Sequence, residues 1–211
     1  MELLLDLFHR LRDLDALVAW AGMAGLFAII FTETGLFFGF FLPGDSLLVT
    51  AGLLSATPES PVKFNIVLLG CLLSAAAIIG DNTNYWVGRL SGPKIFNRDD
   101  SLFFKRKHVD NAHAFYEKYG PITVVLCRFM PIIRTFAPLV AGVGQMNYRV
   151  FLTYSVIGGL SWIWSMLMTG YLLGRYVPGV AQHVEKVIIV VVLISISPAI
   201  FGAIKARKSG K

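Results

Sequence analysis

Four charged residues stand inside long apolar stretches of this chain, where they could bind or neutralise an anion. Glu33 and Asp45 lie in the first stretch, and Arg128 and Arg134 lie in a later one. A charge at the centre of a membrane helix costs at least ~2.5–3.5 kcal/mol, so such residues usually mark the path of an ion or substrate. An acidic stretch paired with a basic one therefore predicts a buried site for a charged ligand.

The acidic side chains have the chemistry of proton carriers. Burial disfavours the charged form of a carboxyl group, so Glu33 in an apolar wall suits a group that gains and loses a proton. For Glu33 the alternative is a structural ion pair with an arginine. Asp45 follows Pro43-Gly44 and can cap the next helix, which leaves capping alone as its alternative. Asp81, inside a third apolar segment, is a further candidate for proton coupling.

The arginines have the chemistry of phosphate binding. A guanidinium stays charged in any protein, and its planar fork matches phosphate or carboxylate. Arg128 and Arg134 stand on either side of Pro131, so they can converge on one anion. The hydroxyls of Thr135 and Ser46 lie beside these charges and complete the predicted lipid-phosphate site. The alternative is that both arginines only neutralise the buried acids, and a salt-bridged site that opens for phosphate would do both.

Proline and glycine interrupt both charged stretches, which predicts two re-entrant hairpins. The breaks are Pro43-Gly44 in the first stretch, and Pro131 and Pro138 in the second. Proline removes a backbone donor, and irregular backbone at membrane depth survives only when packed in protein or lining a wet cavity. The segment after Pro43 is too short to span, since a span needs about 20 apolar residues. We expect each stretch to enter the membrane, turn and leave on the same side.

Composition places the chain in a membrane. Hydrophobic residues make up 55% and charged residues only 15%, whereas soluble domains average about 25% charged residues. The net charge of +6 comes from basic residues at span ends, so anionic lipid headgroups are the expected partner and nucleic acid is not. Cys71 and Cys127 lie in apolar runs and are expected to be small buried hydrophobes. We expect no metal, no cofactor and no enzymatic nucleophile, because no such pattern occurs.

The elements that would position these residues occur in a repeated order. The predicted fold is an all-α, polytopic membrane protein with two amphipathic surface helices, two broken hairpins and about three full spans. The order is surface helix, hairpin and span, twice, and then one more helix. The predicted ranges are 2–18, 23–54, 64–88, 90–119, 121–146, 150–176 and 187–204.

Charge placement predicts the topology. Lys and Arg residues put segment 90–119 and the carboxyl terminus in the cytoplasm. The two halves then have inverted topology, as in many secondary transporters with a site at the membrane midplane. We expect a single membrane domain over 1–211. Its parts are a first repeat 1–90, a second repeat 91–176, and an extra helix with a basic tail at 177–211.

Small residues at four-residue spacing predict close helix packing. Gly80, Asn84 and Gly88 share one helical face, and Gly170 and Gly174 share another. Small side chains let the backbones of membrane helices approach closely.

Together the sequence motifs of this chain resemble those of the DedA family of bacterial membrane proteins, which is related to the eukaryotic SNARE-associated Golgi domain proteins. The resemblance covers nearly the whole chain. It rests on Glu33, Phe41-Leu42-Pro43-Gly44-Asp45-Ser46, Gly80-Asp81, Asn84-Tyr85, Gly88-Arg89, Phe115-Tyr116, Tyr119-Gly120, Arg128-Phe129, Pro131, Arg134-Thr135, Pro138, Ala141-Gly142, Met146, Gly158 and Trp162. It implies a part in envelope integrity, proton-motive-force homeostasis and the recycling of undecaprenyl phosphate, and eukaryotic relatives scramble phospholipids. It also implies that Glu33, Asp45, Arg128 and Arg134 are the functional charges.

The predicted function is a lipid translocase of the bacterial inner membrane that uses the proton gradient to move a polyprenyl phosphate, such as undecaprenyl phosphate, or a related phospholipid. One alternative is a membrane-embedded lipid phosphatase. The string Pro43-Gly44-Asp45-Ser46 resembles that of undecaprenyl-pyrophosphate phosphatases but lacks the Arg-Ser that should follow. The other alternative is a small-cation or drug/proton antiporter, which has less use for paired buried arginines. A homo-oligomer is left open.

Overall fold

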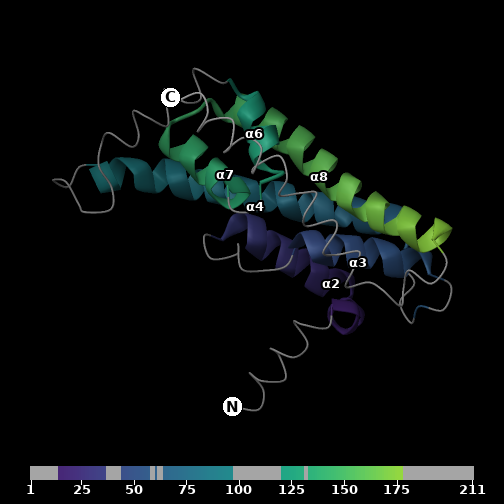
Figure 1. Ribbon diagram of the computed structural model, residues 1–211. Helices are drawn as coiled ribbons and strands as arrows, with labels where there is room; N and C mark the ends of the chain where they lie inside the picture. The colour runs from purple at the N-terminus through teal and green to yellow at the C-terminus, as the bar shows by residue number, and fades with distance from the viewer. Residues whose placement is uncertain are drawn as a thin grey trace, which may run out of the picture.

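The computed structural model describes residues 14–36, 44–57, 60, 64–96, 120–130 and 133–177, and every regular element among them is a helix (Figure 1). The helices are α2 (Leu14–Gly35), α3 (Gly44–Ala56), α4 (Ile66–Phe96), α6 (Ile122–Cys127), α7 (Ile133–Val143) and α8 (Tyr148–Tyr176). The all-α prediction is confirmed for this part of the chain. Most of the first predicted surface helix, residues 97–119 of the second, and the predicted span 187–204 lie outside the described residues.

Two of these helices are long and apolar enough to cross a membrane. They cover Ile66–Ser91 of α4 and Tyr148–Tyr176 of α8, about 39 and 43 Å at 1.5 Å per residue, against a hydrocarbon core of about 30 Å. Both agree with predicted spans. However, α4 continues to Phe96, so the surface segment expected from residue 90 cannot begin there, and the predicted repeat boundary falls inside α4. Pro93 lies within this helix and removes one backbone donor from it.

Each broken stretch folds into two short helices. α2 is kinked at Gly22, whose φ of 56° lies in the left-handed region that glycine adopts without strain. The part of α2 after the kink and α3 are each too short to span alone. The end of α2 contacts the start of α3, where the Glu33 carboxyl lies against the Gly44 backbone. α6 and α7, the two short helices of the second broken stretch, also contact each other.

The proline breaks have different outcomes. Pro43 and Pro131 lie outside the described residues, although α3 begins at Gly44, directly after Pro43. Pro138 was expected to break the second hairpin, and this is wrong: it lies inside α7, which runs through it. Pro138 is the sixth of the eleven residues of α7, so its missing N–H removes one backbone hydrogen bond from the middle of the helix.

One short helix of each half packs on the long helix of the other half. α3 packs on α8, and α7 packs on α4, while α4 and α8 run alongside each other (Figure 1). At each crossing two glycines lie against the backbone of the opposite helix, where a Cβ atom would overlap a carbonyl oxygen. These glycines are Gly52 and Gly170 between α3 and α8, and Gly88 and Gly142 between α4 and α7. The predicted packing roles of Gly88 and Gly170 are confirmed.

Replacing Gly170 by valine is expected to lower the thermal stability of the protein markedly. The new side chain would meet the carbonyl of Val49, and backbone cannot move aside as a flexible side chain can. Overpacking of this kind costs about 1–3 kcal/mol. Thr169→Val is the matched control, because Thr169 is exposed and bonds only within its own helix, to the Ser165 carbonyl. Equal unfolding temperatures for the two purified variants in detergent would contradict this packing.

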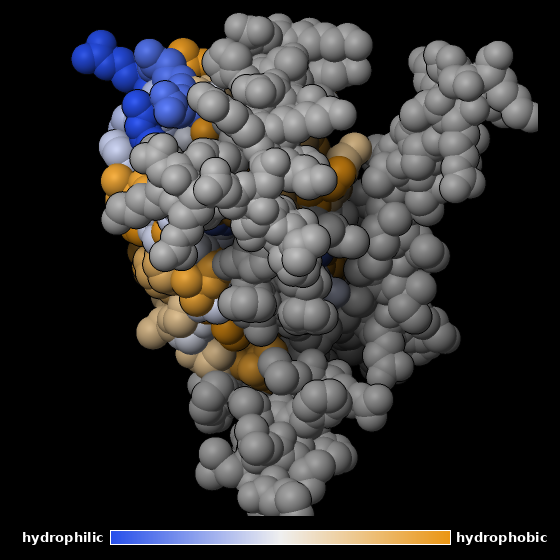
Figure 2. Space-filling view, turned by 90° about the vertical axis from the view of Figure 1, so that its left-hand side faces the viewer, coloured by the Kyte–Doolittle hydropathy of each residue, from blue (hydrophilic) through white to orange (hydrophobic). Residues whose placement is uncertain are grey.

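The outer surface of the long helices is apolar. Figure 2 shows hydrophobic residues over most of the coloured face, with hydrophilic ones gathered at its upper edge. Exposed large side chains lie along both spans, among them Leu68, Ile79 and Trp86 on α4 and Ile157 and Leu160 on α8. Cys71 is exposed on α4, although burial was expected, because one face of a membrane helix meets lipid instead of protein. Cys127 is buried as predicted.

Candidate functional site

The predicted charges meet in the interior, where the short helices begin or end. Each of the charged residues is at most 9% exposed. They are Glu33 near the end of α2, Asp45 in the first turn of α3, Asp81 in α4, Arg128 at the end of α6 and Arg134 in the first turn of α7. Trp162, at the midpoint of α8, contacts both arginines. Charged residues from five helices, α2, α3, α4, α6 and α7, therefore meet beside the middle of α8.

The first group of contacts, the Arg134 cluster, consists of Arg134, Glu33, Asp45 and Trp162. One terminal nitrogen of Arg134 pairs with the Glu33 carboxylate, and the other lies 2.5 Å from Asp45 Oδ1. Trp162 Nε1 donates to the same Asp45 oxygen at 2.8 Å, and the Arg134 guanidinium lies 4.7 Å from the Trp162 ring centroid. The guanidinium fork thus holds two carboxylates over an aromatic face, which favours a cation.

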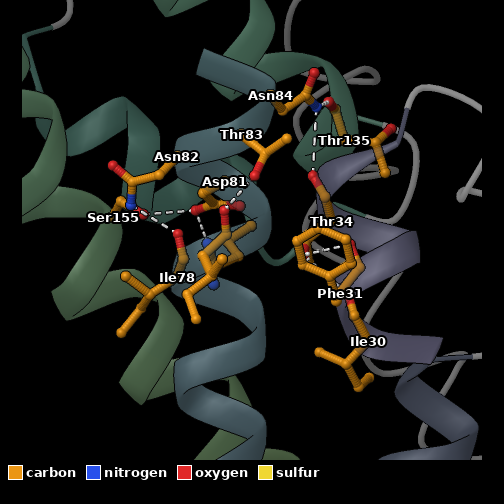
Figure 3. A network of polar contacts seen from close by, with 12 residues as sticks. Ile30, Phe31, Thr34, Ile78, Asp81, Asn82, Thr83, Asn84, Thr135 and Ser155 are labelled. Atoms are coloured by element: carbon orange, nitrogen blue, oxygen red, sulfur yellow. Dashed lines mark hydrogen bonds and ion pairs between the residues drawn. The ribbon is translucent and has the colours of Figure 1, made fainter. Parts of the chain in front are cut away.

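The second group, the Arg128 cluster, consists of Arg128, Asp81 and Ser155. Arg128 pairs with Asp81 Oδ2, and the Ser155 hydroxyl donates to that oxygen at 2.6 Å; Figure 3 shows Ser155 beside Asp81. The sequence left open that both arginines converge on one anion. In the structure each arginine has its own carboxylate partners.

Asn84 links the ends of two short helices. Its side-chain amide donates to the Thr135 carbonyl at 2.6 Å and to the Thr34 carbonyl at 3.3 Å, and so bridges α7 and α2 from α4 (Figure 3). Thr135 is buried, and Ser46 is half-buried one residue after Asp45 in α3. Thr135 follows Arg134 in the chain, and Ser46 follows Asp45, so each predicted hydroxyl residue is the chain neighbour of a charged residue of the Arg134 cluster.

Gly44 is required by the packing of Glu33. A Cβ atom at Gly44 would overlap the Glu33 carboxyl, so only glycine lets the start of α3 lie against that side chain. From the sequence, Gly44 was predicted only as part of the helix break at Pro43-Gly44. Its close approach to Glu33 adds a second reason for glycine at this position.

The two clusters together hold three acids and two arginines. If every acid is ionised, these residues carry one more negative than positive charge. Binding one proton would make the set neutral, which lowers the cost of keeping it away from water. The arrangement can therefore exchange a proton, or an anion for a carboxylate, without leaving a large uncompensated charge.

Two contributors to the site were not predicted from the sequence. They are Ser155 and Trp162, both on α8. The available signal was a tryptophan at the centre of a span, since a buried indole N–H needs an acceptor. For Asp45, capping alone does not describe the geometry, because its carboxylate bonds Arg134 and Trp162.

Comparisons with known proteins agree with this architecture. Residues 42–172 match the VTT domain family. The chain is 44% identical over 189 residues to an uncharacterized membrane protein of Mycobacterium tuberculosis, covering 90% of this chain and 82% of that protein. It is 41% identical over 216 residues to protein DedA of Escherichia coli (99% and 97%), and 31% identical over 209 residues to the inner membrane protein YqjA of that species (96% and 92%). No solved structure matches the chain. The chain belongs to the DedA family of VTT-domain membrane proteins.

Proposed function

We propose that the protein is a proton-coupled translocase that moves the phosphate headgroup of a lipid through the buried clusters. The observation that carries this proposal is the fork of Arg134, buried in the interior and holding two carboxylates. A fork that holds two carboxylates has the geometry to take a phosphate in the same way. The substrate would be a polyprenyl phosphate, such as undecaprenyl phosphate, or a related phospholipid.

Proton coupling follows from competition for Arg134. Glu33 and the incoming phosphate would use the same guanidinium nitrogen, so protonation of Glu33 weakens its hold and releases that donor for phosphate. Loss of the proton restores the carboxylate and expels the headgroup. The excess of acids over arginines supports this exchange, because one proton or one displaced carboxylate keeps the site close to neutral.

We further propose two inverted repeats with re-entrant hairpins in a bacterial inner membrane, with the carboxyl terminus in the cytoplasm; the packing of α3 on α8 and of α7 on α4 supports the repeats. In this arrangement the lipid tail stays in the bilayer while the headgroup crosses between the hairpins. The similar Escherichia coli protein YqjA is named as an inner membrane protein.

The hairpin arrangement predicts that the start of α2 and the end of α3 face the same side of the membrane. Single cysteines at Ala19 and at Thr57, in a chain without Cys71 and Cys127, should react with an impermeant thiol reagent from the same side. The control is the same chain without any cysteine. Labelling from opposite sides would mean that this stretch crosses the membrane completely.

The proposed function is tested by headgroup accessibility in proteoliposomes. The probe is a fluorescent polyprenyl phosphate in one leaflet, followed with an impermeant quencher, with and without a pH gradient. We expect the protein to speed exchange between leaflets, and the gradient to increase that rate further. Release of inorganic phosphate would instead indicate a lipid phosphatase. Gradient-driven movement of a small cation or drug without lipid movement would indicate an antiporter.

A further inference from the structure

We propose that the Arg128 cluster is a second binding station for a phosphate group, separate from the Arg134 cluster, and that Asp81 and Ser155 gate it. This inference rests on the proposed function and divides its binding site into two. The headgroup would occupy one arginine at a time, with Trp162 between the two positions.

The first observation is that Arg128 has unused donors. Its side chain is almost fully buried, and one terminal nitrogen is paired with Asp81, whereas the other, Nη1, has no hydrogen-bond acceptor among the described residues. A guanidinium has five N–H donors and no acceptor. Buried donors without acceptors are costly, so this side chain is poised to take an anion with several oxygens.

The second observation is that α8 leaves room for the guanidinium. Gly158 and Gly159 face Arg128, and a Cβ atom at Gly159 would lie 2.8 Å from one of its terminal nitrogens. The nearby Ser155 hydroxyl donates to Asp81 at 2.6 Å and so holds the competing carboxylate in place. Ser155, Gly158 and Gly159 thus lie on one face of α8, beside Arg128 at the end of α6.

The third observation is that both arginines lie beside the Trp162 ring but pair with different carboxylates. The indole N–H is committed to Asp45 in the Arg134 cluster, whereas the ring lies 4.7 Å from the Arg134 guanidinium and 5.9 Å from that of Arg128. Asp81 has no contact with Arg134 among the ion pairs of the described residues. Each station thus has its own competing carboxylate.

The test is phosphate binding to the purified full chain in detergent. The probes are farnesyl phosphate and inorganic phosphate, with farnesol as the uncharged control, and the measurements are a binding titration and the ligand-induced rise in unfolding temperature. Asp81→Asn removes the competing charge, so we expect farnesyl phosphate to bind about tenfold more tightly, the size of one charge-assisted hydrogen bond. The gain should vanish when Asp81→Asn is combined with Arg128→Lys.

Ser155→Ala provides a milder variant in case Asp81→Asn does not fold. It loosens Asp81 without removing it, so a smaller gain in affinity of about threefold is expected. Thr153→Ala on the same helix is the matched control, because Thr153 is exposed and bonds only the Arg149 carbonyl, and its affinity should equal that of the wild type.

The outcomes separate this inference from the proposed function. Wild-type binding with no gain in Asp81→Asn, or in Ser155→Ala where only that variant folds, overturns the second station and leaves the proposed function standing. No phosphate binding by any variant overturns both. A gain for farnesyl phosphate alone supports a station for lipid headgroups, and an equal gain for inorganic phosphate supports a station that also takes free phosphate.

Discussion

Arg134→Lys is expected to cause a strong loss of lipid-phosphate transport while the protein still folds and reaches the membrane. The two terminal nitrogens of Arg134 reach two carboxylates on different helices, Glu33 on α2 and Asp45 on α3. A lysine ammonium is a point charge on a flexible stem and cannot reproduce that planar fork. Losing one charge-assisted hydrogen bond, worth ~1.5–3 kcal/mol, should slow transport at least about tenfold.

The measurement is the initial rate of headgroup exchange in proteoliposomes at matched protein content. Arg175→Lys is the control, because Arg175 is exposed in the last turn of α8 and far along that helix from Trp162. A rate near that of the wild type in Arg134→Lys would leave Arg134 as a counter-ion for the acids, with no part in phosphate recognition.

Glu33→Gln is expected to remove the stimulation by a proton gradient while lipid binding persists. The amide has the size of the carboxyl group and resembles its protonated form, so it fits against the Gly44 backbone. Removing one partner of a buried ion pair typically costs ~3–5 kcal/mol. Here the loss in stability should be smaller, because Asp45 still pairs with Arg134.

Three measurements on this variant decide its role: unfolding temperature, binding of the lipid phosphate, and exchange rate with and without the gradient. Asp45→Asn is the matched comparison, since it removes the other carboxylate from the same fork. If Glu33 carries the proton, Asp45→Asn slows exchange but keeps the ratio of the rates with and without the gradient. Exchange by Glu33→Gln that still responds to the gradient would exclude Glu33 from coupling.

The long helices and the charged residues inside apolar stretches could be located from the sequence, because both depend on local patterns. Apolar length identifies α4 and α8, and a charge in an apolar stretch stands out without any knowledge of its neighbours. The end of α4 could not be predicted, since Gly92-Pro93 is a strong local stop signal that the helix nevertheless passes. Pro138 is a similar case inside α7.

The pairing within the site could not be predicted, because it depends on which helices cross. Nothing local to Asp81 distinguishes Arg128 from Arg134 as its partner. That choice follows from the packing of α8 on both α4 and α6, which brings Ser155 and Arg128 beside Asp81. Trp162 was missed for the same reason: its indole N–H finds an acceptor on α3, far away in the sequence.

The packing of α3 on α8 and of α7 on α4 means that each half of the protein completes the other. The first half can therefore finish folding only after the second half has been synthesised. The crossing of α3 on α8 brings Gly52 against backbone that the ribosome makes much later, near Gly170. Roughly 120 residues separate the two glycines, and at ~5–20 residues per second their synthesis takes about 6–24 s. During that time α3, with Asp45 at its start, has not met its partner helix. The nascent first half must therefore be shielded by lipid, an insertase or a chaperone until the second half arrives, and neither half is expected to fold when expressed alone.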